Sequence, residues 1–389
     1  MSRHRLVAML ERGVRSGRLD LTLPDGSRHA IGGDAPGPDA VVIVHRWRTL
    51  RRLAWGGGVG FAEAYLDGDW ESPDLAPVIE LAARNRGLAD KGTRPNRFVQ
   101  ALHWLRHAVR ANTPTGSRRN IAAHYDLGNE FYRRWLDATM TYSSAVYAAP
   151  GQSLDDAQRH KCRLLLDRLA PQPGQHVLEI GSGWGGFAVL AAKERGVNVT
   201  GITLSKEQYE FASRRAAAEG VADRVSFELR DYRDLDRRFD HVVSIEMFEA
   251  VGEAYWPVFF AKVAGALKSG GHAALQIITI DDRQFETYRR TADFIQTYIF
   301  PGGMLPSPAR LKAETATAGL RWVGDSGFGQ DYARTLATWR DRFETAWGEI
   351  EPLGFDERFR RMWRFYLAYC EGGFRSGAID VKQIALAKG

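Results

Sequence analysis

Residues able to hold a nucleotide-type cofactor gather in one glycine-rich stretch near the middle of the chain. Residues 177–180 are apolar except for Glu179, and residues 181–186 contain four glycines in the spacing G-x-G-x-G-G. Glycines let the backbone approach a ligand closely, and the start of a following helix attracts polar ligand groups. The spacing departs from the dinucleotide pattern G-x-G-x-x-G. The stretch predicts a cofactor loop, with a plain tight turn as the alternative.

The elements around this loop form a regular β/α alternation. Further apolar runs cover residues 197–202, 225–229, 242–245 and 272–280. Helical patterns separate them at 187–193, 206–219 and 255–267. Such alternation predicts an α/β fold with a parallel sheet and with ligands at the carboxyl ends of its strands. The residues at those ends are Gly181, Thr203, Asp231 and Glu249.

Size and composition favour a cytoplasmic protein of two domains. The chain has 389 residues, of which 44% are hydrophobic and 26% charged, with a net charge of +6, and a single core rarely extends over so many residues. Its two cysteines, Cys162 and Cys370, form no metal or disulfide pattern, which suits a reducing compartment. Without an 18-residue apolar run, any membrane contact is expected to be peripheral, at the inner face.

The N-terminal part, residues 1–83, reads as a small α+β accessory domain. Strand patterns at 19–23 and 41–44 and a helix with a turn at 61–70 are separated by glycine and proline. The triple glycine 56–58 lacks the Lys-Ser/Thr of a phosphate loop, so a structural role is expected.

A basic segment, residues 84–117, separates the two parts. Arginines and lysines outnumber a single acid, Asp90, between residues 84 and 119, and the apolar helical pattern 98–105 lies among them. Such a segment is typical of attraction to anionic lipid head groups, at ~1 kcal/mol per surface cation. A solvated linker whose apolar stripe packs on a neighbour is the alternative. No motif for nucleic acid is present.

Aromatic residues are concentrated in the second part of the chain. They are frequent in residues 124–147 and in an insertion at 287–308. This insertion is longer than a connection between two elements needs, which suggests a lid or wall for an apolar substrate. Two amphipathic helices, at 336–350 and 357–374, and a final strand at 379–387 complete the expected elements.

Six short motifs occur in order from residue 118 onward. They are His-Tyr-Asp-x-Gly-Asn from 124, Thr-Tyr-Ser from 141, Leu-Glu-Ile-Gly-Ser-Gly-Trp-Gly-Gly from 178, Thr-Leu-Ser-x-x-Gln from 203, Met-Phe-Glu from 247 and Tyr-Ile-Phe-Pro-Gly-Gly from 298. In these motifs the chain resembles the cyclopropane-fatty-acid synthases, which are S-adenosylmethionine-dependent methyltransferases. The first 110 residues are similar to the accessory domain of members that act on bacterial phospholipids.

The resemblance implies a Rossmann-like class I methyltransferase domain over 118–389, with aromatic helical insertions, and an accessory domain for lipid contact or dimerisation in a homo-oligomer. It implies cofactor contacts from Tyr142, Ser143, Glu179, Gly181, Gly183, Thr203, Leu204, Gln208, Asp231 and Tyr232. It implies a substrate pocket lined by Phe248, Tyr298 and Phe300. The catalytic residues implied are Glu249, Tyr332, Ser144 and Gln276.

The chemistry implied is attack of a cis alkene of a phospholipid acyl chain on the sulfonium methyl group of S-adenosylmethionine. The resulting carbocation must be shielded from water, and aromatic faces stabilise it by ~1–2 kcal/mol each when desolvated. In the family the final proton passes to bicarbonate, held by a cysteine, a glutamate, a histidine and a tyrosine. Here Ser144 and Gln276 stand where the family has the cysteine and the histidine.

This departure leaves two products open. Loss of a proton from the added methyl group gives a cyclopropane. A hydride shift followed by loss elsewhere gives a methylene branch, which a separate reductase turns into a methyl branch in a subgroup of the family. The strings Glu-Met-Phe-Glu-Ala-Val-Gly and Phe-Pro-Gly-Gly-Met-Leu-Pro-Ser look close to that subgroup. No metal site is expected.

Two other functions compete with this reading. A methyltransferase acting on a small polar acceptor is disfavoured by the apolar insertion at 287–308. A lipid-binding homologue without turnover would explain Ser144 and Gln276, but the retained Glu249 and Tyr332 count against it.

The basic segment generates the first prediction. Replacing Arg94, Arg97, Arg106 and Arg110 with Gln should weaken flotation with anionic vesicles, most at low salt, where the attraction is least screened. Activity on detergent-dispersed lipid should fall less. Four arginines of residues 1–83, replaced in the same way, serve as the control. Unchanged flotation at low salt would identify the segment as a linker.

Overall fold

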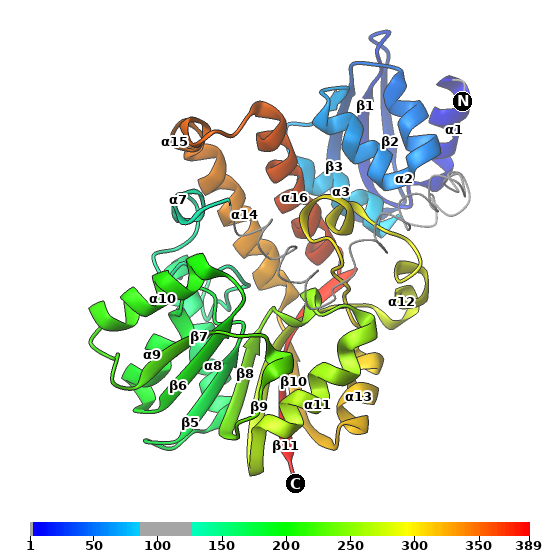
Figure 1. The fold of residues 1–389 in the computed structure, drawn as a ribbon. Coiled ribbons are helices and arrows are strands. Elements are labelled where there is room, and N and C mark those ends of the chain that lie inside the picture. The colour runs from blue at the N-terminus through cyan, green and yellow to red at the C-terminus, as the bar shows by residue number, and fades with distance from the viewer. Residues whose placement is uncertain (1–2, 86–126) are drawn as a thin grey trace. The chain divides into compact units, whose positions relative to one another are not determined.

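The computed structural model describes residues 3–85 and 127–389, which form two compact units (Figure 1). Unit 1 contains Met1–Val109, Thr287–Ile299 and Leu336–Ile379, and unit 2 contains Arg110–Glu286, Phe300–Thr335 and Asp380–Gly389. The division expected from the sequence, 1–83, 84–117 and 118–389, is contiguous. The structure instead assigns two later segments to unit 1. The basic segment, apart from Arg84 and Asn85, lies outside the described residues.

Unit 2 is built on a seven-stranded sheet with the order β10-β11-β9-β8-β5-β6-β7. Its strands are β5 His176–Ile180, β6 Asn198–Thr203, β7 Val225–Leu229, β8 Phe239–Ile245, β9 Leu267–Ile280, β10 Leu320–Gly327 and β11 Ile379–Lys388. The pairs β5–β6, β5–β8, β6–β7 and β8–β9 are parallel. Residues such as Val177, Val199 and Val243 are fully buried, as the apolar runs require. The predicted α/β fold is confirmed.

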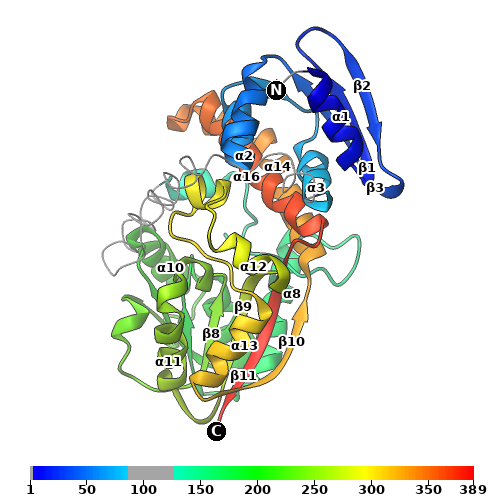
Figure 2. The same cartoon turned by 90° about the vertical axis from the view of Figure 1, so that its right-hand side faces the viewer.

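Two layers of helices cover this sheet. Helix α9 Gly186–Arg195 contacts both α8 Leu154–Leu169 and α10 Lys206–Ala218. Helix α11 Trp256–Ala266 contacts α13 Pro308–Thr317 in the layer that Figure 2 shows in front. Serines 153, 205 and 307 begin α8, α10 and α13 as side-chain caps, each worth ~1 kcal/mol. Shorter helices are α7 Asn129–Arg133 and α12 Asp282–Tyr288. Strand β10 was not predicted, because its polar sequence alternates only weakly.

Unit 1 contains a four-stranded sheet with the order β2-β1-β3-β4. Its elements from the N-terminal part are α1 Arg3–Gly13, β1 Ser16–Thr22, β2 Arg28–Gly32, β3 Ala35–Val44, α2 Arg48–Leu66, β4 Trp70–Glu71 and α3 Leu75–Arg84. The triple glycine lies within α2, where Gly57 has φ +57° and interrupts the helix. A structural role for the triple glycine stays a prediction. In the described part of the chain no helix is long and apolar enough to cross a membrane.

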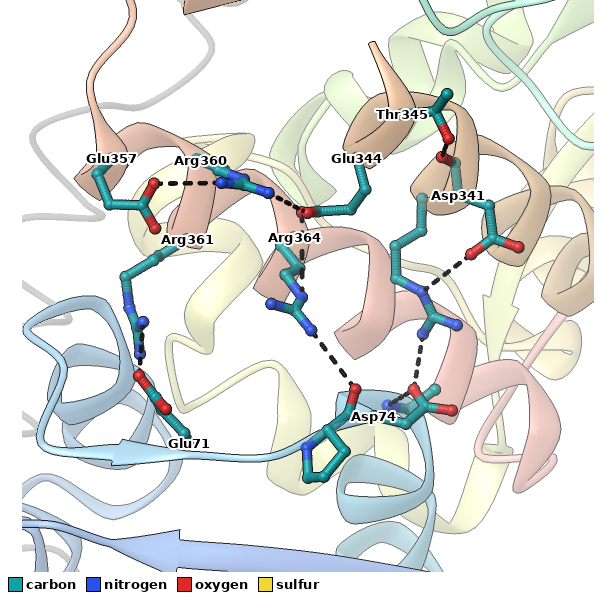
Figure 3. Close-up of polar contacts among 12 residues, drawn as sticks. Glu71, Asp74, Asp341, Glu344, Thr345, Glu357, Arg360, Arg361 and Arg364 are labelled. Atoms are coloured by element: carbon teal, nitrogen blue, oxygen red, sulfur yellow. Dashed lines mark hydrogen bonds and ion pairs between the residues drawn. The ribbon is translucent and has the colours of Figure 1, made fainter. Parts of the chain in front are cut away.

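Helices from the second half of the chain complete unit 1. They are a π-helix Ile295–Ile299, residues 336–345 of α14 Gly329–Thr345, α15 Trp347–Ile350 and α16 Glu357–Arg375. Ion pairs tie them to the N-terminal part. Arg340 lies 3.1 Å from Asp74, and Arg361 lies 3.3 Å from Glu71, as Figure 3 shows. These contacts, together with the packing of α16 on α3, explain why unit 1 is discontinuous.

Helix α16 packs closely against α3 at Gly372. A Cβ atom there would lie 2.7 Å from the Cβ of Ile79 and 2.8 Å from the backbone nitrogen of Glu80. At Gly373 an added Cβ would meet only the end of the Ile379 side chain, at 3.1 Å.

Gly372→Ala is expected to destabilise unit 1 by ~1–3 kcal/mol, because neither α3 backbone nor a Cβ atom can move aside easily. Gly373→Ala is the matched control, since it carries the same gain in helix propensity of ~1 kcal/mol without the backbone clash. Denaturant unfolding followed by tryptophan fluorescence measures both. Equal stability of the two variants would contradict the close approach of the helices.

Candidate functional site

The glycine loop joins β5 to α9 and exposes its backbone on one side. Gly181, Gly183 and Gly185 have φ values of +83°, +51° and +81°, which L side chains rarely adopt. A Cβ at Gly185 would lie 2.8 Å from Phe227. A Cβ at Gly183 would meet no atom within 4 Å. Gly185 is therefore required by packing, whereas Gly183 leaves backbone open to a ligand.

Two buried polar groups beside this loop have no hydrogen-bond partner among the described residues. They are Oε2 of Glu179, a residue only 2% exposed, and Oγ of Ser182. Burial raises the pKa of Glu179 well above its ordinary value, and the charge of Lys161 opposes that shift. Buried polar atoms without partners cost ~1–3 kcal/mol each. The pair therefore fits a ligand that brings its own donors, such as the ammonium group of S-adenosylmethionine.

The ends of β6 and β7 hold the next group of predicted cofactor residues. The Thr203 hydroxyl donates to Oε1 of Gln208 at 2.9 Å, which ties β6 to the first turn of α10. Leu204 lies between them and is half-buried. The buried Asp231 carboxylate accepts from Nε of Arg233 at 2.9 Å. Burial raises the pKa of the neighbouring Tyr232 to about 12, so its phenol stays protonated.

Tyr142 belongs to an aromatic layer on the other side of the loop. Its ring lies 5.4 Å from that of Tyr132 and 5.5 Å from that of Trp135, and Tyr132 contacts Trp184 of the glycine loop at 5.1 Å. The layer thus extends from the predicted cofactor tyrosine to the loop itself.

Ser143 is held by a buried lysine that the sequence analysis missed. Nζ of Lys161 donates to the Ser143 hydroxyl at 2.7 Å, and the lysine is completely buried. Burial lowers its pKa, while the acids around it, Glu246 among them, act in the opposite direction. Lys161 lies in a charged stretch of α8, and nothing in the local pattern separates it from surface lysines.

Three predicted catalytic residues meet at one carboxylate, and that carboxylate is Glu246. Its Oε1 accepts from the backbone nitrogen of Ser144 at 2.8 Å and from Nε2 of Gln276 at 2.7 Å. Its Oε2 accepts from the Tyr332 hydroxyl at 2.7 Å. The side-chain hydroxyl of Ser144 donates instead to the carbonyl of Ala145. The sequence analysis missed Glu246, although it directly follows β8 and is thus at a strand end.

Glu249, the fourth predicted catalytic residue, has a different environment. Its Oε1 accepts from the backbone nitrogen of Ile278 at 2.5 Å, and its Oε2 has no partner among the described residues. Burial, and secondarily the charge of Glu246, raises the pKa of Glu249 to about 8. Burial also raises the pKa of Glu246, but Tyr332, Gln276, Lys161 and Ser144 all oppose the shift. Near neutral pH, Glu249 is therefore largely protonated, whereas the three donated hydrogen bonds favour the charged form of Glu246.

The turn that carries these acids touches the glycine loop and the insertion. A Cβ at Gly181 would lie 2.8 Å from Cγ of Met247. The backbone nitrogen of Met304 donates to the carbonyl of Glu249 at 2.8 Å. The cofactor loop and the carboxylates thus form one edge of unit 2.

The three predicted substrate residues lie in different surroundings. Phe248 is 1% exposed and packs among Trp256, Phe259 and Phe260. Phe300 belongs to unit 2, where its carbonyl accepts from Gly303 at 3.0 Å. Tyr298 belongs to unit 1, and its hydroxyl donates to Glu63 at 2.6 Å. Their contact with substrate stays a prediction.

The sheet order, the open glycine loop at the end of a central strand and the polar strand ends define a class I, S-adenosylmethionine-dependent methyltransferase. The family model described as mycolic acid cyclopropane synthetase matches residues 112–384, and the chain belongs to this family. Membership of this family identifies the cofactor as S-adenosylmethionine, which carries a reactive methyl group on its sulfur atom.

Individual relatives agree with this assignment. The chain is 41% identical over 385 residues to tuberculostearic acid methyltransferase UfaA1 of Mycobacterium tuberculosis, covering 95% of this chain and 88% of the relative. It is 36% identical over 362 residues to the cyclopropane-fatty-acyl-phospholipid synthase of Escherichia coli, covering 92% and 90%. The cyclopropane synthase MmaA2 from Mycobacterium tuberculosis superposes with a TM-score of 0.66 at 32% identity, covering 70% of this chain and 98% of that one.

A complex of the mycolic acid cyclopropane synthase CmaA1 with SAH and CTAB gives a TM-score of 0.67, also at 32% identity, with 70% and 98% coverage. The resemblance inferred from the motifs is confirmed. The chain is an S-adenosylmethionine-dependent methyltransferase of the cyclopropane synthase type, and its relatives support methyl transfer to a lipid double bond.

Gly183→Val is expected to abolish measurable cofactor binding by calorimetry, because a branched side chain fills the open side of the loop. Valine at φ +51° also strains the backbone. Gly220→Val is the matched control: it has φ +69° and open space around it, but it lies at the far end of α10. Unchanged cofactor affinity in a folded Gly183→Val protein would contradict the assignment of the loop.

Proposed function

We propose that the protein transfers the methyl group of S-adenosylmethionine to a cis double bond in an acyl chain of a membrane phospholipid, through a carbocation. The observation that carries this proposal is the close approach of the cofactor loop, at Gly181, to Met247 in a turn that bears two half-buried acids, Glu246 and Glu249. A methyl donor and a proton acceptor are then both available at one water-poor edge of the sheet. The relatives named for cyclopropane synthesis support the same reaction type.

The residues of the chain have a limited task in this reaction. The sulfonium methyl group is already electrophilic, so the alkene needs no activated nucleophile. The protein must orient the acyl chain, exclude water from the cation and remove one proton. The half-buried acids Glu246 and Glu249 and the buried Tyr332 meet the requirement for proton removal. Aromatic residues of the layer around Tyr142 stabilise positive charge.

Two products are compatible with this task. The first is a cyclopropane, formed when the proton leaves the added methyl group. The second is a methylene branch, formed after a hydride shift and reduced later by a separate enzyme. Two observations favour the second: Ser144 and Gln276 replace the cysteine and histidine expected for bicarbonate, and the relative at 41% identity is named a methyltransferase.

The substrate is proposed to be reached from the inner face of the membrane. The basic segment would supply attraction to anionic head groups, and unit 1 would serve lipid contact or assembly of a homo-oligomer. These parts of the proposal rest on the sequence pattern of residues 84–117 and on the resemblance of the N-terminal part.

Labelled S-adenosylmethionine incubated with vesicles of cis-unsaturated phospholipid tests the proposal. We expect the label in the acyl chains, with none in vesicles of saturated phospholipid, because only an alkene can attack the methyl group. Mild hydrogenation of the released acids then separates the products: a methylene branch takes up hydrogen and a cyclopropane does not. Label found only on a small polar acceptor would contradict the proposal.

A further inference from the structure

The carboxylate of Glu246 is surrounded as a bound anion would be. Donors from three separate elements converge on it: the backbone of Ser144 from the loop before α8, Gln276 from β9 and Tyr332 from α14, all at 2.7–2.8 Å. These are three of the positions that the family resemblance assigns to bicarbonate. In this chain they hold a side chain of the protein instead.

The donors are oriented by groups behind them. Nε2 of Gln383, a buried residue of β11, donates to Oε1 of Gln276 at 3.1 Å, which turns the amide nitrogen of Gln276 toward Glu246. The backbone nitrogen of Ala145 donates to the hydroxyl of Thr335 at 3.3 Å, which ties the segment after Ser144 to the helix that carries Tyr332. The arrangement is therefore built into the core of unit 2.

The backbone at Glu246 is bent to bring its carboxylate there. Its φ of +49° lies in the left-handed region, which disfavours a residue with a Cβ by ~1–2 kcal/mol and would suit glycine. Its nitrogen donates to the carbonyl of Gln276 at 2.8 Å, which fixes the turn against β9. Strain of this kind persists where surrounding contacts hold it, and it is concentrated at functional sites.

We propose that Glu246 is the resident base of this methyltransferase and takes the place of an external bicarbonate ion. The assignment rests on the proposed function. The alkene electron pair forms a bond to the methyl carbon, and the carbon–sulfur pair returns to sulfur. The Glu246 carboxylate then takes a proton from the cation. The electron pair of that carbon–hydrogen bond closes a cyclopropane, or forms a double bond after a hydride shift, and the carboxylic acid afterwards releases its proton to water.

Glu249 has a supporting role in this scheme. With one oxygen bonded to Ile278 and a raised pKa, it is largely a neutral acid near pH 7. A second carboxylate charge beside Glu246 would be unfavourable. Because Glu246 supplies the base, turnover of the native protein should be independent of added bicarbonate.

Chemical rescue tests the assignment. Glu246→Gly removes the carboxylate, relieves the backbone at φ +49° and leaves the three donors facing an empty anion site. We expect kcat to fall by ~10²–10⁴, and formate or bicarbonate to restore part of it. Glu246→Gln is the matched control: it fills the same space without basicity, so its rate should fall equally and neither anion should restore it.

Near-normal turnover of Glu246→Gln, or a glycine variant that neither anion accelerates, would overturn the assignment. Thermal unfolding supplies a readout that needs no activity. Bicarbonate should raise the melting temperature of Glu246→Gly, since a ligand bound only by the folded state stabilises it, and should leave the native protein unchanged. A native protein that methylates no lipid refutes the proposed function, whereas the melting experiment still decides whether Glu246 fills an anion site.

Discussion

Burial of ionisable groups at the carboxyl edge of one sheet is the constraint on which this site depends. Glu179, Glu246 and Glu249 all have pKa values raised by burial, and Lys161 has its pKa lowered for the same reason. A charge in such surroundings persists only with a partner or several hydrogen bonds. The charge of Lys161 opposes the rise in pKa at both Glu179 and Glu246.

The two acids of the turn differ because their donors differ. Glu246 accepts three hydrogen bonds that engage both of its oxygens, whereas Oε2 of Glu249 has no partner among the described residues. Neighbouring carboxylates that are both desolvated cannot both ionise without a large cost, so one is expected to hold the charge and the other the proton. Environment, rather than residue type, thus separates a base from a neutral acid.

The sequence predicts the parts of the structure that depend on periodicity. The apolar runs predict strands β5 to β9 and the helices between them, and the glycine spacing predicts the loop, because both patterns are local. Glu246 and Glu249 are indistinguishable by pattern, because a positive φ at a non-glycine residue leaves no trace in sequence. The discontinuity of unit 1 was also hidden, because it depends on long-range contacts such as Arg340 with Asp74 and Gly372 with α3.

A base that is a side chain of the protein has a fixed position, and this position limits which proton can be removed; a diffusible anion has no such limit. Glu246 is fixed by its strained turn and by donors on three elements, so its reach into the site is set by the fold. The carbon that loses its proton is then decided by how the acyl chain lies against that carboxylate. A base near the added methyl group closes a ring before the cation rearranges. A base that faces the chain carbons allows the hydride shift, and the register of the bound acyl chain becomes the determinant of a cyclopropane or a branch.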